Sequence, residues 1–111
     1  MLKPNEQIQM KKTLVYEYEI MGSAHSWGVE VFLSRAKKSG EWTVDFKYTD
    51  PEAVGSAMNF AESAEDFLYI AEERYFDLYS FCDALKETKK KELITLADEI
   101  QIAIQKIHKK I

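Results

Sequence analysis

The second half of the chain, residues 56–111, contains neither glycine nor proline. A single helix over that whole stretch would be more than about 70 Å long at roughly 1.5 Å per residue. Such a rod does not fit a compact chain of 111 residues. We therefore predict two helices that form an antiparallel hairpin, and we expect the turn in the polar, lysine-rich residues 86–91.

Each predicted helix carries an apolar stripe, because apolar side chains recur at steps of three and four and so share one side of a helix. The first stripe consists of Phe60, Ala64, Phe67, Ala71, Tyr75, Leu78, Cys82 and Leu85. The second consists of Leu93, Leu96 or Ala97, Ile100, Ala103 or Ile104, Ile107 and Ile111. We expect these two stripes to form the core of the helical layer.

The first half of the chain alternates apolar and polar residues, which is the pattern of half-buried strands. Three apolar sets result: Leu14, Tyr16, Tyr18 and Ile20; Trp27, Val29, Val31 and Leu33; and Trp42, Val44, Phe46 and Tyr48. A tight turn at Ser39-Gly40 would pair Leu33 with Phe46. The loop at residues 21–26 would let Ile20 face Trp27. All three sets then lie on one face of the sheet, which supports this register.

The connection between the two halves allows two interpretations. Asp50-Pro51 suits the start of a helix, with Asp as the cap and Pro at the first helical position. A glycine, a serine and an asparagine that follow are poor in a helix interior. We prefer a short fourth strand over residues 56–61, with Met58 and Phe60 facing the core.

These elements predict an α+β fold in one domain, residues 1–111. An antiparallel β-meander of three or four strands, residues 12–61, is covered on one face by a C-terminal antiparallel helical hairpin, residues 62–111. The lengths agree, because helices of about 23 residues are roughly 35 Å long and strands of about nine residues roughly 30 Å.

Composition narrows the class of protein. The net charge of −4 argues against non-specific nucleic-acid binding, which depends on lysine and arginine neutralising phosphates. A single cysteine cannot form an internal disulfide. The N-terminus has no apolar signal core, and no run approaches the roughly 20 apolar residues of a membrane span. We predict a small, acidic, cytoplasmic protein with no membrane contact.

The face opposite the first apolar stripe is acidic and carries two aromatic residues, and we take it as the candidate partner-binding surface. Its residues are Glu62, Asp66, Tyr69, Glu73, Phe76 and Asp77. Acidic groups around aromatic anchors suit a surface that docks on a basic partner. The alternative interpretation is a solvated helix face partly neutralised by the lysines of the last helix.

A second candidate site is a small-ligand pocket between sheet and helices, for an anion or a nucleotide. Its residues are Arg35, Lys37, Trp27 and Trp42. The competing structural interpretation is cation–π packing, or lysine and arginine stems lying along apolar surface at the sheet end.

The sequence offers no catalytic constellation. It contains no glycine-rich phosphate loop, zinc spacing or nucleophile elbow. Neither His25 nor His108 stands three residues after a glutamate, as a helical di-iron site requires. We predict no catalytic residues, no metal site and no cofactor.

The predicted function is therefore that of a non-enzymatic protein-interaction domain, in the role of a small inhibitor or accessory protein. The partner is a protein that presents a basic surface. Ile94 and Ile102 make the last helix apolar on more than one side, and such a helix is usually covered on more than one side. We therefore also predict a homodimer through the helical layer.

Overall fold

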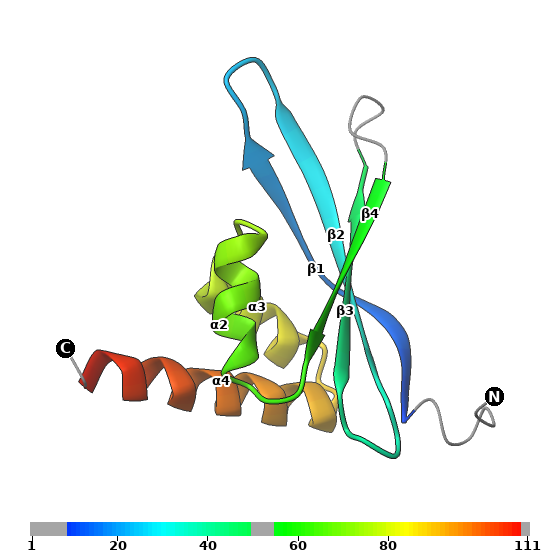
Figure 1. The fold of residues 1–111 in the computed structure, drawn as a ribbon, viewed down its shortest axis with the longest axis vertical. Helices are drawn as coiled ribbons and strands as arrows, with labels where there is room; N and C mark the ends of the chain where they lie inside the picture. The colour runs from blue at the N-terminus through cyan, green and yellow to red at the C-terminus, as the bar shows by residue number, and fades with distance from the viewer. Residues whose placement is uncertain (1–8, 50–54, 110–111) are drawn as a thin grey trace. The chain divides into compact units, whose positions relative to one another are not determined.

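The computed structural model describes residues 9–49 and 55–109. Within these ranges the chain forms a four-stranded antiparallel sheet followed by three helices (Figure 1). The predicted α+β class, with an antiparallel meander and C-terminal helices, is confirmed. The strands belong to one compact unit, Met1–Glu62, and the helices to another, Ser63–Ile111. The single domain, and the covering of one sheet face by the helices, stay predictions.

The strands pair in sequence order. They are β1 (Met10–Met21), β2 (Ser26–Arg35), β3 (Trp42–Tyr48) and β4 (Gly55–Ala61). The preference for a fourth strand is thereby confirmed, while the helix start considered at Asp50-Pro51 lies outside the described residues. The predicted pairing of Ile20 with Trp27 is also confirmed.

The two central strands bury most of their predicted apolar faces, while Trp27 and Tyr48 at one end of the sheet are half-buried. The buried side chains are Val29, Val31, Leu33, Trp42, Val44 and Phe46. The register between β2 and β3 differs from the prediction by two residues, because Leu33 pairs with Val44 and not with Phe46. The turn is longer than two residues: the N–H of Gly40 donates to the carbonyl of Ala36 at 2.9 Å, and Gly40 has φ of +73°. A shift of two leaves every side chain on its face.

A bulge in β1 places one residue on the face of the sheet opposite to the predicted one. Leu14 pairs with Phe32, but the next pair is Tyr16 with Val31, so Val15 is an extra residue in β1. Leu14 therefore lies on the face opposite to Tyr16 and is exposed, whereas Val15 is buried. The prediction that Leu14 shares the face of Tyr16 is wrong.

The facing of β4 also differs from the prediction. Ala61 pairs with Trp42, and Ala57 pairs with Phe46. Directly paired residues share a face, so the two alanines lie with the buried aromatics of β3. Met58 and Phe60 project from the other face of the sheet and are exposed. We call this second face, which also carries Leu14, the outer face.

The predicted helix over residues 60–85 is two helices, which corrects the sequence analysis. They are α2 (Asp66–Glu73) and α3 (Leu78–Glu87), and Phe60 lies in β4. The break falls where Tyr75 adopts φ of 58°, in the left-handed region that ends helices. The N–H of Phe76 then donates to the carbonyl of Ala71 at 3.0 Å.

Three residues separate α3 from the last helix, α4 (Lys91–Lys109), so the predicted turn within residues 86–91 is confirmed. Lys86 of α3 joins the two helices: its Nζ lies 3.0 Å from Gln101 Oε1 and 3.5 Å from Asp98 Oδ1. None of the helices in the described ranges is long and apolar enough to cross a membrane.

The helical unit has its own apolar core. Most of the two predicted stripes is buried, but Tyr75 and Ile107 are exposed, which corrects their assignment to the core. Ile111, also predicted to be part of the second stripe, lies outside the described residues. The stacked rings of Phe67 and Phe81 lie 5.8 Å apart. Thirteen residues are buried within residues 63–109, the part of this unit that is described: Phe67, Ile70, Ala71, Phe76, Phe81, Cys82, Leu85, Leu93, Leu96, Ala97, Ile100, Ala103 and Ile104.

Candidate protein-docking surface

The acidic residues predicted to line one helix face do not form a continuous helical stripe. Glu62 precedes the helices, and Asp66 is the first residue of α2. The Oδ2 of Asp66 accepts a hydrogen bond from the N–H of Ser63 at 3.2 Å, as in a capping box. Glu73 ends α2 and pairs with the adjacent Arg74 at 3.9 Å.

Asp77 has a structural role at the start of α3. It is the N-cap residue, and its Oδ1 accepts a hydrogen bond from the N–H of Tyr79 at 3.1 Å. Its Oδ2 accepts one from Ser80 Oγ at 2.7 Å. A helix break separates it from Glu73, so these two acids do not lie one turn apart on a single helix. The carboxylate of Asp77 therefore stabilises the start of α3.

The two predicted aromatic anchors have opposite environments. Tyr69 projects from α2 and is 71% exposed, as the prediction requires. Phe76 is only 8% exposed, and its ring centroid lies 5.1 Å from that of Phe81. The placement of Phe76 on the exposed acidic face is therefore wrong, because the helix break turns this ring into the core.

Two exposed aromatic residues were missed by the sequence analysis. Tyr75 is 75% exposed and Tyr79 is 54% exposed. Tyr75 was assigned to the core only because a continuous helix would have placed it there. The signal that could have found both is Asp77 followed by Leu78, Tyr79 and Ser80, since aspartate is among the preferred N-cap residues.

An apolar groove lies beside Tyr79 within the helical unit. It has a volume of about 250 Å³ and receives side chains from all three helices: Leu68, Ala71, Leu78, Tyr79, Ile104, Ile107 and His108. Grooves between helices are common docking sites for apolar anchors of a partner. Tyr79 is thus both exposed and part of the groove.

Charge is concentrated around these tyrosines. Between residues 66 and 87 the chain has six carboxylates against two basic residues, Arg74 and Lys86. Five of the six carboxylates are exposed: Glu72, Glu73, Asp77, Asp83 and Glu87. We call residues 66–87 the acidic tyrosine segment, after these carboxylates and Tyr69, Tyr75 and Tyr79.

The residues of the alternative ligand pocket do not converge. Arg35 and Trp42 are paired across β2 and β3, and the guanidinium lies 4.9 Å from the indole ring. The Nε of Arg35 donates to the carbonyl of Gly40 at 3.0 Å. Lys37 is exposed in the neighbouring turn. Trp27 lies at the other end of β2, which is roughly 26 Å away at about 3.3 Å per residue.

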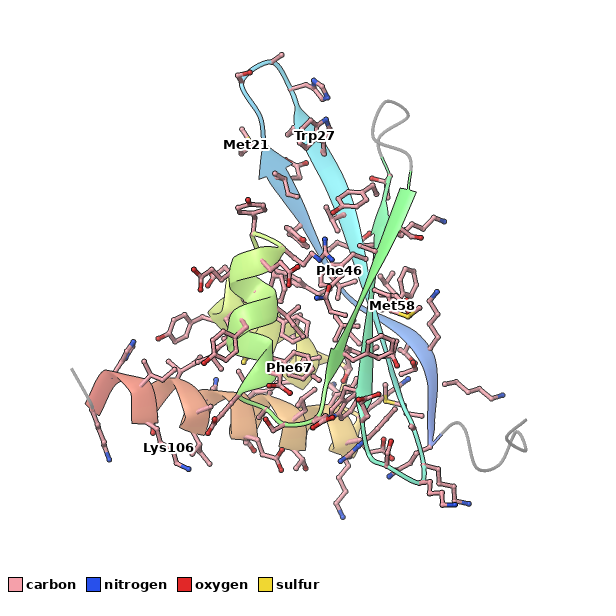
Figure 2. The ribbon with its side chains drawn as sticks, viewed as in Figure 1. Met21, Trp27, Phe46, Met58, Phe67 and Lys106 are labelled. Atoms are coloured by element: carbon pink, nitrogen blue, oxygen red, sulfur yellow. The ribbon has the colours of Figure 1, made fainter. Side chains whose placement is uncertain are left out.

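Trp27 and Met21 lie at the tip of the β1–β2 hairpin (Figure 2). The Nε1–H of Trp27 donates to His25 Nε2, and the two rings meet edge to face at 5.3 Å. This contact fixes the side chain of His25 on its own hairpin. Arg35 and Trp42 thus form a cation–π pair at one end of the sheet, and Trp27 packs on His25 at the other.

Cys82 is fully buried in α3, and burial raises the pKa of its thiol to about 11. In residues 9–49 and 55–109, no group of three or more His, Cys, Asp or Glu side chains is arranged to hold a metal ion. Comparisons with protein-family models, with curated proteins and with solved structures find no match for this chain.

Proposed function

We propose that the protein is a non-enzymatic interaction domain whose acidic tyrosine segment docks on a basic protein surface. The observation that carries the proposal is the exposure of Tyr69, Tyr75 and Tyr79 in a segment with six carboxylates. Tyr79 also lines an apolar groove. Aromatic rings that are more than half exposed bury little apolar surface and so contribute little to folding. Tyrosines dominate binding energy where a partner covers them.

The chemistry of the partner follows from this surface. The carboxylates attract lysine and arginine and speed the encounter, while the tyrosines and the groove hold the complex after water is excluded. The partner should therefore present an apolar side chain surrounded by basic residues. A small protein that occupies such a surface can act as an inhibitor or as an accessory subunit of its partner.

Affinity capture from native lysate, with quantitative comparison of variants, tests the proposal. The wild type should capture a partner protein. The double variant Tyr69→Ala/Tyr79→Ala and the single variant Glu72→Lys should each capture clearly less of it. Capture should also decline as the salt concentration rises, because screening weakens contacts between exposed charges. Neither tyrosine side chain is buried and Glu72 is exposed, so the variants should fold.

The matched control is Met21→Ser. Met21 is a large exposed apolar residue of the β1–β2 hairpin, outside the acidic tyrosine segment. Its replacement should leave capture unchanged. If Met21→Ser loses the captured protein while the tyrosine and glutamate variants retain it, the sheet unit is the docking surface and the proposal is refuted.

Two further proposals accompany this one. We propose that the protein forms a homodimer, and the exposed Ile102 and Ile107 make α4 one candidate for the seam. Light scattering that gives the 12.9 kDa mass of one chain at tens of micromolar protein would refute it. We also propose a cytoplasmic location, since Cys82 is a free thiol and reducing compartments keep thiols free.

A further inference from the structure

The fourth strand has the properties of an edge open to pairing. In the described sheet the order is β1-β2-β3-β4, so β4 is an edge strand that pairs with β3 alone. Its pairing with β3 is regular over all seven residues, with no bulge. Its sequence contains no proline and no charged side chain. Proteins usually protect edge strands with bulges, prolines or charged side chains, because an exposed edge recruits another strand.

The opposite edge is protected in the expected manner. Strand β1 contains two register shifts and carries Lys11, Lys12, Glu17 and Glu19. Bulges and charges both discourage strand addition. Of the two edge strands of the described sheet, only β4 therefore lacks both bulges and charged side chains.

The side chains of β4 are also complementary to those of a second copy of the strand. Met58 and Phe60 lie two residues apart on the outer face, and both are more than half exposed (Met58 is labelled in Figure 2). If a second β4 lies antiparallel with Asn59 opposite its own copy, Met58 of each chain faces Phe60 of the other. Pairs of an aromatic and an aliphatic residue across strands stabilise a sheet.

We propose that β4 is a self-association edge, where two copies pair antiparallel about Asn59 and join their sheets into one. The strand has no charged side chain, so this arrangement places no like charges opposite one another at any position of the seam. The inference concerns the sheet unit and is independent of the acidic tyrosine segment.

Light scattering on paired charge variants tests the seam. The wild type should have about twice the 12.9 kDa chain mass at tens of micromolar protein. Met58→Lys/Phe60→Lys sets lysines opposite one another across the seam, so it should be a monomer. Met58→Glu/Phe60→Lys sets opposite charges there, so it should recover the dimer and lose it again at high salt.

The matched control for the charge variants is Ile102→Lys in α4. Ile102 is 53% exposed and Met58 is 54% exposed, so the two sites accept lysine at a similar cost. The Ile102 variant should remain a dimer. A monomeric wild type overturns the proposal. So does a dimer that Ile102→Lys disrupts and Met58→Lys/Phe60→Lys leaves intact, because the seam then lies in α4.

A disulfide measures the register without adding charge. Residues directly opposite in antiparallel strands have Cα atoms about 4.5–5.5 Å apart, within disulfide range. Asn59→Cys should therefore form a covalent dimer under mild oxidation. Ala57→Cys lies on the same strand and face but should stay roughly 13 Å from its copy and not link. Equal linking of both variants, or none for Asn59→Cys, would contradict the register.

Discussion

At the scale of single residues, Tyr75 and Phe76 show how strongly one backbone conformation decides the environment of a side chain. The positive φ of Tyr75 places its own ring in solvent and turns Phe76 onto Phe81. Phe76→Ala should lower the free energy of unfolding by about 3 kcal/mol or more, as for other buried phenylalanines. Tyr75→Ala should change it by no more than about 0.5 kcal/mol. Urea denaturation of both variants measures the difference, and equal losses would contradict these environments.

Cys82 gives a pH dependence with a definite sign. Its folded-state pKa is raised from 9.0 to about 11 by burial, so the folded protein resists ionisation of the thiol. The contribution to stability is complete below pH 9 and is lost between pH 9 and 11, where only the unfolded chain releases the proton. The expected loss is at most roughly 2–3 kcal/mol.

The measurement for Cys82 compares the wild type with Cys82→Ala in urea at pH 8 and at pH 10.5. Because lysines and tyrosines titrate equally in both proteins, their contributions cancel in the difference. The stability advantage of the wild type should shrink at the higher pH. A constant advantage would show that the thiol reaches solvent in the folded protein.

At the scale of elements, α3 depends on its cap. Asp77 satisfies the N–H of Tyr79 and binds the hydroxyl of Ser80. Asp77→Ala should therefore lower the free energy of unfolding by about 1 kcal/mol, the usual cost of losing an N-cap side chain. Asp83→Ala, within the same helix and exposed, is the control and should be nearly neutral. Thermal unfolding of both variants by circular dichroism decides between a capping and a solvated Asp77.

Sequence periodicity predicted the sheet better than the helices, for physical reasons. Alternation in β2 and β3 is enforced by burial on one face, and the two-residue error at Leu33 left the faces unchanged. The bulge at Val15 could not be predicted, because one extra residue reverses the alternation without any change in composition.

The helix break was missed because helical spacing continues across it. Phe67, Ala71, Leu78 and Cys82 fit one long helix as well as two short ones, so periodicity alone does not reveal Tyr75 and Asp77 as the end of α2 and the cap of α3. The candidate site changed accordingly: Tyr69 was predicted correctly as exposed, Phe76 was not, and Tyr75 and Tyr79 came from the structure.

At the scale of the whole chain, charge is segregated along the sequence. Residues 66–87 are acidic, whereas lysines follow in the α3–α4 turn and in the last turn of α4, where Lys106 extends from the helix (Figure 2). Cations at a helix C-terminus are favourable, so the lysines of α4 have a local explanation. The acidic tyrosine segment keeps an excess of negative charge that its own helices do not neutralise.

The affinity of the captured protein shows whether the acidic tyrosine segment is a docking surface. Its dissociation constant should be measured by calorimetry for the wild type, Tyr69→Ala/Tyr79→Ala and the control Met21→Ser. We expect at least about tenfold weaker binding for the tyrosine variant, which is a loss of roughly 1.4 kcal/mol or more of binding free energy. The control should bind as tightly as the wild type. Equal affinity of the wild type and the tyrosine variant would contradict it.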